Sequence, residues 1–250
     1  MTINVISDLH LPLYFIYDIP FVEWDQFDPD KLSPADYLVI AGDISIGPYY
    51  KICLNELKQR TKNKFKKILY CKGNHDYWKD NSPKNHTFEI IDDNIAIIGT
   101  TMWSPISQTN SKYVSKQMND FYYIKNFNVV KQNNLFYKEI DWLEKKVDIH
   151  KSNGRKVVVV THHNPFKELI PNKFKSSYLN SAYACLTGEC DNVCPDVWIC
   201  GHIHTPVDMI ITKNNMPIRC VRNPIGYMKS VYGGSNECKD DTWYNKILTV

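Results

Sequence analysis

Seven residues of types that commonly bind metal ions come directly after short apolar runs of this 250-residue chain. The seven are Asp8, His10, Asp43, Asn74, His162, His202 and His204. The runs before them cover residues 3–7, 37–41, 67–71, 157–160 and 197–200. Short runs rich in valine, isoleucine and leucine that end in glycine or polar residues are typical of buried strands. Because ligands gather just beyond the carboxyl ends of strands in open α/β sheets, we expect the seven side chains to converge.

These residue types predict a centre for two divalent metal ions. Two such ions held about 3.5–4 Å apart repel each other strongly, so an anionic group must lie between them. Asp8 and Asp43 oppose only part of the ions' positive charge, so the centre would stay cationic and attract a phosphoester oxygen. Oxygen and imidazole ligands without thiolate suit Mn²⁺, Fe²⁺ or Zn²⁺ with open coordination positions, whereas a structural zinc site would usually show paired cysteines.

The motifs that carry these residues follow one another in a characteristic order. They are Asp8-Leu9-His10, Gly42-Asp43, Gly73-Asn74-His75-Asp76, Thr161-His162-His163 and Gly201-His202-Ile203-His204. In this order the chain closely resembles the calcineurin-like metallophosphoesterase superfamily, from Asp8 to His204. Two shorter runs, residues 99–103 and Asn223-Pro224-Ile225-Gly226-Tyr227, resemble a bacterial-type branch of predicted phosphohydrolases.

The resemblance implies a role for each motif residue and a fold. The implied metal ligands are divided between two ions, with Asp8, His10 and His204 on one and Asn74, His162 and His202 on the other. Asp43 would bridge the ions, and His75 would be the catalytic histidine, which binds no metal. The implied fold class is α/β, a four-layer αββα sandwich with two mixed β-sheets and with the metals at the carboxyl ends of the strands.

Residues next to the motif ligands admit more than one interpretation. Asp76 either orients or stabilises His75, as a second catalytic residue, or is a solvated acid in a turn. His163 should point away from His162, because side chains alternate along an extended segment, although it could instead support the site or contact substrate. We expect His86 and His150 at the surface, the latter at the end of a helix, where a cation is favourable.

Length and composition favour one soluble domain over residues 1–250. No apolar stretch approaches 18 residues and no basic and apolar leader is visible, so we expect a cytoplasmic protein without a membrane span. Cys71 and Cys200 fall within predicted strands, and Cys190 and Cys194 lack the close pairing of a zinc ribbon, which favours a reducing compartment over a third, structural metal. A net charge of +3 is too small to indicate a polyanionic partner, and the oligomeric state stays open.

Two long excursions interrupt the predicted strands. Residues 12–34 and 100–136 are rich in aromatic side chains, and we expect each either to form a wall over the metals or to pack a satellite core.

Helices and a hairpin are also predicted. One helix should start near Tyr49 and end in the basic run 60–67, which fits a solvated helix end better than a nucleic-acid patch. A second, amphipathic helix should cover residues 137–150. Segments 207–211 and 217–221 should form antiparallel strands joined by a turn at Asn214-Asn215.

The implied reaction is phosphoester hydrolysis, in which a bridging water activated as hydroxide attacks in line and His75 protonates the leaving oxygen. Serine/threonine protein phosphatases of the superfamily carry phosphate-gripping arginines in two of the motifs, and the runs Gly42–Gly47 and Lys72–Asp76 lack them. Purple acid phosphatases place a tyrosine ligand where this chain has Ile46. We therefore expect a small phosphodiester substrate such as a nucleotide. The alternatives are a broad-specificity phosphomonoesterase, a nuclease and, least favoured because His75 is present, a non-catalytic metal-binding scaffold.

Overall fold

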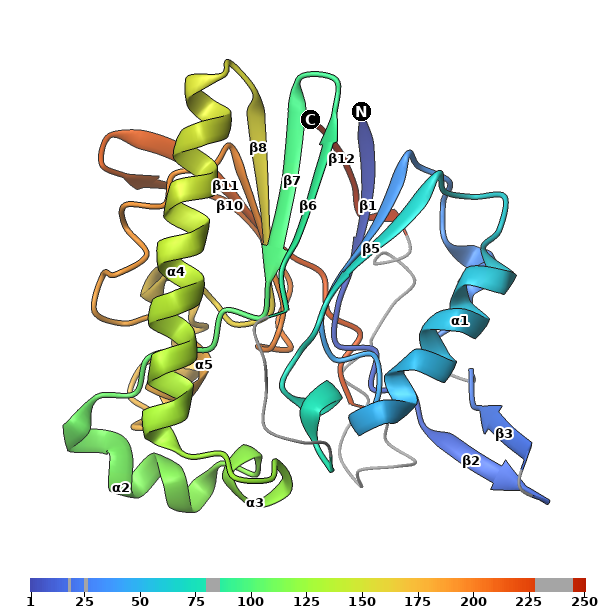
Figure 1. Cartoon of the computed structure of the whole chain (residues 1–250), viewed down its shortest axis with the longest axis horizontal. Helices are drawn as coiled ribbons and strands as arrows, with labels where there is room; N and C mark the ends of the chain where they lie inside the picture. The colour runs from blue at the N-terminus through green and yellow to red at the C-terminus, as the bar shows by residue number, and fades with distance from the viewer. Residues whose placement is uncertain (18, 25–26, 80–85, 228–244) are drawn as a thin grey trace.

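Two mixed β-sheets form the centre of the molecule (Figure 1). The computed structural model describes residues 1–17, 19–24, 27–79, 86–227 and 245–250. The smaller sheet has the order β12-β1-β4-β5, made of β12 (Ile247–Thr249), β1 (Thr2–Ile6), β4 (Tyr37–Ala41) and β5 (Lys67–Cys71). Strands β1, β4 and β5 are parallel, and β12 runs antiparallel to β1.

The larger sheet has the order β10-β11-β9-β8-β7-β6. Its strands are β10 (Val207–Lys213), β11 (Met216–Arg222), β9 (Val197–Cys200), β8 (Lys156–Thr161), β7 (Ile95–Thr100) and β6 (Phe88–Asp92). The four inner strands are parallel, and β10 and β6 close the two edges in the antiparallel direction.

One long helix covers the outer face of each sheet. Helix α1 (Tyr50–Arg60) lies on the smaller sheet and α4 (Val129–Ser152) on the larger one (Figure 1). The short helices are α2 (Gln108–Gln117), α3 (Asp120–Tyr123), α5 (Asn180–Tyr183) and the 3₁₀ turns Pro29–Lys31, Gly47–Tyr49, His75–Tyr77, Lys167–Leu169 and Asn172–Phe174. The order helix, sheet, sheet, helix confirms the expected four-layer α/β sandwich.

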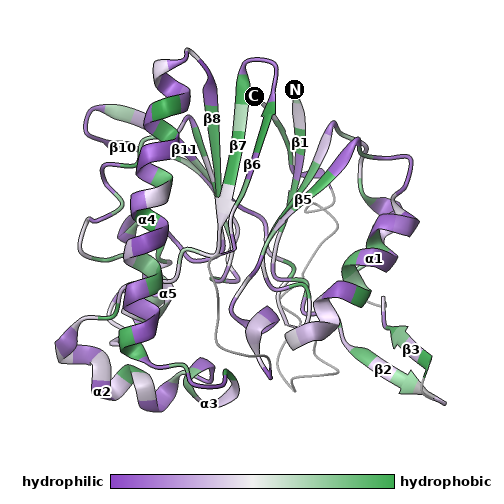
Figure 2. Cartoon of the chain, viewed as in Figure 1, coloured by the Kyte–Doolittle hydropathy of each residue, from purple (hydrophilic) through white to green (hydrophobic). Residues whose placement is uncertain are grey.

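The apolar runs of the sequence reflect burial on both faces of each sheet. In β4, Leu38 and Ile40 pack with Leu57 of α1, whereas the intervening Val39 packs between the sheets against Val158. Because successive side chains point to opposite faces, a strand with covers on both sides must be apolar at every position. Figure 2 shows hydrophobic residues concentrated in the strands of both sheets.

Several predicted elements are confirmed, and one boundary is wrong. Helix α1 starts at Tyr50, and β10 and β11 form the expected hairpin through Asn214 and Asn215, both with positive φ. The helix predicted over 137–150 is α4, which begins at Val129 instead. The Asn128 side chain caps it by accepting the peptide N–H of Lys131 at 3.0 Å. The early turns are rich in polar residues, so apolar periodicity alone does not reveal them.

One further expectation needs correction. His150 is buried, with 2% of its surface exposed, and its Nε2 lies 2.8 Å from a Glu89 carboxylate oxygen, so it is not a surface residue. Excursion 12–34 contains a small hairpin, β2 (Leu13–Ile16) and β3 (Ile19–Val22). No helix in the described part of the chain is long and apolar enough to cross a membrane.

Candidate metal centre

The predicted ligands lie together at the carboxyl ends of strands from both sheets. Asp8 and His10 follow β1, Asp43 follows β4, His162 follows β8, and His202 follows β9. Asp8, His10, Asp43 and His202 have positive φ values of 54°, 43°, 54° and 67°. A left-handed backbone is costly for residues with a side chain and persists where the surrounding structure enforces it, as at functional sites. The strand ends therefore turn sharply to aim these side chains at one another.

Glycines allow the close approach of the turns. A Cβ atom at Gly73 would collide with the carboxylate of Asp43, and one at Gly201 would collide with the carbonyl oxygen of Ala41. These two motifs therefore need glycine just before the ligand, because the neighbouring strand end passes too close for any side chain.

The first group of ligands is Asp8, His10 and His204. The Nε2 atoms of His10 and His204 are 3.1 Å apart, and His204 Nε2 lies 3.5 Å from Asp8 Oδ1. Metal–ligand bonds of about 2.0–2.2 Å place neighbouring ligand atoms roughly 3 Å apart around one ion. The three ligand atoms lie within 4.8 Å of one another and so fit one divalent ion. Asp8 also accepts the peptide N–H of His202 at 2.9 Å, which ties the two sheets together.

The second group contains Asp43, Asn74, His162 and His202. His162 Nε2 lies 2.9 Å from Asn74 Oδ1 and 3.4 Å from Asp43 Oδ2, and His202 belongs to the same cluster. Asp43 Oδ2 is also 3.7 Å from His10 Nε2, which belongs to the first group. Asp43 thus lies between the two groups, where a carboxylate would contact both ions.

The histidine nitrogens that face the centre suit metal binding. His162 Nδ1 lies 2.9 Å from the carbonyl oxygen of Ala41 and donates to it, which leaves the Nε2 lone pair directed toward Asn74 and Asp43. His202 Nε2 is buried and has no hydrogen-bond partner among the described residues. A buried polar atom without a partner is costly, and a metal ion would satisfy it.

Charges at the centre shift the pKa values of its histidines. Burial opposes protonation of His162, but the carboxylates of Asp43 and Asp8 outweigh it and raise the pKa of His162 to about 9. Burial and neighbouring histidines hold the pKa of His202 well below its ordinary value. His202 is therefore neutral and ready to bind an ion, whereas His162 must first lose a proton.

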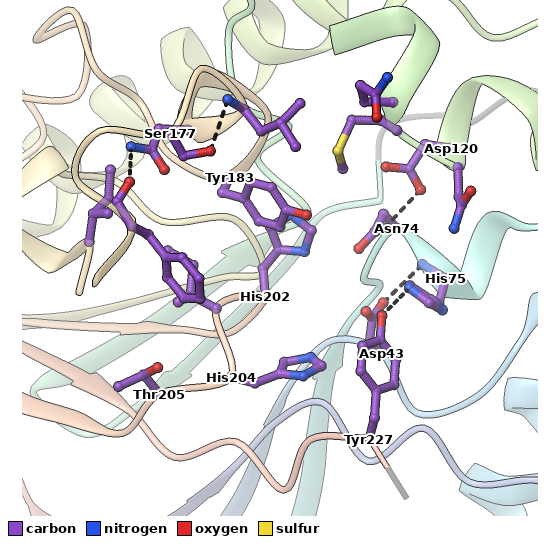
Figure 3. A pocket seen from close by; sticks show the side chains of 18 of the residues that line it. Asp43, Asn74, His75, Asp120, Ser177, Tyr183, His202, His204, Thr205 and Tyr227 are labelled. Atoms are coloured by element: carbon purple, nitrogen blue, oxygen red, sulfur yellow. Dashed lines mark hydrogen bonds between the residues drawn. The ribbon is translucent and has the colours of Figure 1, made fainter. Parts of the chain in front are cut away.

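His75 lies beside the centre, between an aromatic ring and the bridging candidate. Its imidazole stacks on Trp78 with ring centroids 3.7 Å apart, and its peptide N–H donates to Asp43 Oδ1 at 2.9 Å. Its Nε2 lies 3.2 Å from the hydroxyl of Tyr227 (Figure 3). Burial lowers the pKa of His75, although the carboxylates of Asp43 and Asp120 oppose this effect.

Asp76 does not orient His75, which corrects the expected pairing. Its two carboxylate oxygens accept peptide N–H groups from Asp43, Ile44, Ser45 and Gly73 at 2.8–3.3 Å. The 3₁₀ turn at residues 75–77 directs this buried side chain back under the turn after β4. Burial and the charge of Asp43 raise the pKa of Asp76, against the opposing effect of the amides. Asp76 therefore holds the backbone that presents Asp43.

His163 also departs from expectation. It does not point away from the site but is buried beside it, with its ring stacked on His202 at a centroid distance of 4.2 Å. Its Nδ1 accepts the peptide N–H of Ser104 at 3.2 Å. Sharp turning of the chain after β8 overrides the simple alternation of an extended strand.

Two residues of the site were not predicted as site residues. Asp120 accepts from the side-chain amide of Asn74, and Tyr227 contacts His75. Tyr227 belongs to the run 223–227, which resembles a run in a bacterial-type branch of predicted phosphohydrolases. Asp120 lies in excursion 100–136, where the aromatic residues were the only signal.

A cavity of about 350 Å³ opens over the centre, large enough for a small ligand. One wall is formed by residues 117–120 and the other by residues 170–183, including Tyr183, which stacks on His202 (Figure 3). Both alternatives for excursion 100–136 are therefore found: residues 117–120 supply a wall, and the aromatic residues Trp103, Phe121 and Phe127 pack a satellite core. The described residues of excursion 12–34 do not line this cavity, and Val22 and Phe27 pack beneath α1 instead.

Comparisons with known proteins agree with this geometry. The family model of calcineurin-like phosphoesterases matches residues 1–206. An uncharacterised protein of Acanthamoeba polyphaga mimivirus is 26% identical over 242 residues, covering 81% of this chain and 84% of its own.

Two solved structures share the fold. The phosphopantetheinyl hydrolase of Mycobacterium tuberculosis has a TM-score of 0.56 at 13% identity and covers 94% of both chains. A dimetal phosphatase of Danio rerio has a TM-score of 0.52 at 11% identity, over 88% of this chain and 86% of that one. The family implies a dinuclear divalent metal site, and the clustered ligands fit one. The chain therefore belongs to the calcineurin-like phosphoesterases and is a metal-dependent phosphoester hydrolase.

Proposed function

We propose that this enzyme hydrolyses small phosphodiesters, nucleotides among them. The ligands of one ion are Asp8, His10 and His204, those of the other are Asn74, His162 and His202, and Asp43 is shared. Two bound divalent ions, with Mn²⁺, Fe²⁺ and Zn²⁺ as candidates, supply Lewis acidity that activates water and neutralises phosphate oxygens. The nitrogen and oxygen donors without thiolate support this choice of metals.

His75 is the proton donor in this proposal. Its ring borders the cavity, and its peptide is bound to the shared Asp43, so the imidazole lies beside the place where a phosphoester would bind. A leaving alkoxide needs a proton as the phosphorus–oxygen bond breaks, and a neighbouring protonated imidazole can provide it and become neutral. Asp76 acts indirectly, because the amides that it accepts hold the turn carrying Asp43.

The small amount of positive charge in the cavity lining is the observation that favours a diester. Among the described lining residues Lys173 is the only lysine or arginine, and it is exposed, with its Nζ 4.8 Å from the centre of the Phe174 ring. A phosphomonoester carries close to two negative charges near neutral pH, because its second pKa is about 6. A phosphodiester carries one. Without an arginine to bind the phosphate, the metal centre alone can neutralise the single charge of the diester but not the second charge of the monoester.

Aromatic and neutral polar groups complete the recognition of such a substrate. Tyr183 and Phe174 line the cavity and could stack on a base or another flat group. Asn119 and Asn180 add uncharged hydrogen-bonding groups. These features support a nucleotide-like diester over an extended nucleic acid, for which the chain has a net charge of only +3.

Broad-specificity phosphomonoesterase activity is the second candidate, and the name of the dimetal phosphatase from Danio rerio motivates it. The deciding experiment measures kcat/KM in Mn²⁺ for paired nitrophenyl mono- and diesters at one pH, followed by cyclic nucleotides, dinucleotides and phosphoproteins. We expect the diester to react faster and phosphoproteins to show negligible turnover. A monoester advantage of about tenfold or more, close to 1.4 kcal/mol, would reject the diesterase proposal. A steep loss of binding to oligonucleotides with added salt would instead indicate a nuclease.

A further inference from the structure

Tyr227 contacts the proposed proton donor and both histidines of the first metal group. Its hydroxyl lies 3.2 Å from His75 Nε2. Its ring packs against His10 with centroids 4.4 Å apart and meets the edge of His204 at 4.6 Å. Figure 3 shows the phenol rising beside Asp43 with its hydroxyl directed at His75. Tyr227 also lines the cavity over the metal centre.

The backbone before Tyr227 is anchored to the strand end that carries Asp8. The peptide N–H of Ile225 donates to the carbonyl oxygen of Ser7 at 3.0 Å, and that of Gly226 donates to the carbonyl oxygen of Asp8 at 2.9 Å. Gly226 has a φ of +86°, a left-handed conformation that favours glycine, and it turns the chain toward the cavity. Tyr227 is thus held at a set position relative to the metal ligands.

His75 is restrained on its other sides as well. Trp78 covers one face of the imidazole, and Asp43 holds its peptide. Within the described chain the second ring nitrogen, Nδ1, is buried without a hydrogen-bond partner. The hydroxyl of Tyr227 is consequently the contact that sets the direction of Nε2.

We propose that Tyr227 carries the proton from His75 to the leaving oxygen of the substrate: as the hydroxyl oxygen accepts the Nε2 proton, the hydroxyl hydrogen passes to the leaving oxygen. A phenol suits this position for two reasons. Its hydroxyl can donate to a neutral imidazole and accept from a protonated one, so it holds the ring before and after proton transfer. It also carries no charge, whereas a carboxylate in its place would repel the phosphoester. This inference rests on the role proposed above for His75.

The test is a double-mutant cycle of Tyr227→Phe and His75→Ala, with kcat and KM measured on a nitrophenyl ester and a matched alkyl ester of the class that the wild type prefers. Tyr227→Phe keeps the ring that packs on His10 and His204, so metal content and the thermal midpoint should be unchanged. We expect its kcat for the alkyl ester to fall about 10- to 100-fold with little change in KM, because an interrupted proton path costs rate rather than binding. The loss for the nitrophenyl ester should be much smaller, since a good leaving group needs little protonation.

The double variant distinguishes proton transfer through His75 from an independent effect of Tyr227. If Tyr227 acts through His75, the double variant should be no slower than His75→Ala alone, within about twofold, because the two residues work as a unit. Losses that multiply, or equal losses for both esters, would overturn the inference and leave the role of His75 intact. If His75→Ala itself keeps wild-type turnover, the proposed function of His75 fails instead. Tyr178→Phe, which removes an exposed hydroxyl outside the cavity lining, is the matched control and should behave as wild type.

Discussion

Asp120 Oδ1 accepts a hydrogen bond of 2.8 Å from the side-chain amide of Asn74, and both residues are buried. The same oxygen accepts from the indole N–H of Trp78 at 2.7 Å. The amide nitrogen of Asn74 is thereby turned away from the metal centre, and its oxygen faces His162. One carboxylate thus orients a metal ligand and the ring on which His75 stacks.

We predict that Asp120→Ala weakens metal binding by about 10- to 100-fold, the usual effect of losing a partner that orients a ligand. The Asn74 amide and the Trp78 indole would each lose a buried acceptor, so Asn74 could rotate and present nitrogen to the ion. Metal titration of the apoprotein measures the affinity, and excess metal should restore much of the activity. Asp141→Ala, which removes an exposed carboxylate from α4, should bind metal as wild type does. Unchanged affinity in Asp120→Ala would show that Asn74 does not need this partner.

Asp43→Asn should lower the number of bound ions and abolish turnover. The amide keeps the size of the carboxylate but removes the negative charge between two cations, which then repel each other without compensation. Elemental analysis of purified protein gives the ion count, and activity is measured on the same sample. Two ions per chain with near-normal turnover would exclude Asp43 as the bridging ligand.

Metal affinity should rise with pH up to about pH 9. Asp43 and Asp8 outweigh burial and raise the pKa of His162 to about 9, so the metal-free protein binds a proton there at neutral pH. An ion can use Nε2 only after that proton leaves, and the apparent affinity should therefore increase about tenfold per pH unit below pH 9. Calorimetry in buffers of different ionisation enthalpy detects the released proton. A flat affinity between pH 6.5 and 8.5 would contradict the assignment of His162 as a ligand.

Glu139→Gln should remove a pH-dependent loss of stability. Glu139 of α4 accepts the peptide N–H of Trp103 at 3.2 Å, and burial raises its pKa from 4.5 to about 7. Between these values the folded state keeps a proton that the unfolded state has lost, so the free energy of unfolding falls as pH rises, by about 3 kcal/mol in all. The glutamine variant lacks this titration and should gain stability relative to wild type from pH 4.5 to 7. Denaturant unfolding of both proteins at several pH values measures the difference. Free energies of unfolding that change with pH in the same way in both proteins would contradict the prediction.

Local sequence pattern was sufficient to locate the central strands and to place candidate metal ligands at their ends. Strands β4 and β8 are covered on both faces, so each must be apolar throughout, and that requirement is visible in a short window of sequence. Parallel strands present their carboxyl ends at one edge of a sheet, so Asp8 and Asp43, which follow neighbouring strands, could be expected to meet. His162 follows a strand of the other sheet, and the packing of the two sheets brings it to Asp43.

The partners that orient these ligands could not be found in the same way. Asp120 reaches Asn74 across 46 positions and Tyr227 reaches His75 across 152, and neither pair leaves a periodic or local signal. Asp76 is a similar case, because its neighbour in sequence, His75, is not the group that its carboxylate binds. Tertiary packing decided these contacts, since a buried carboxylate or phenol takes whichever hydrogen-bonding groups the folded chain brings within about 3 Å.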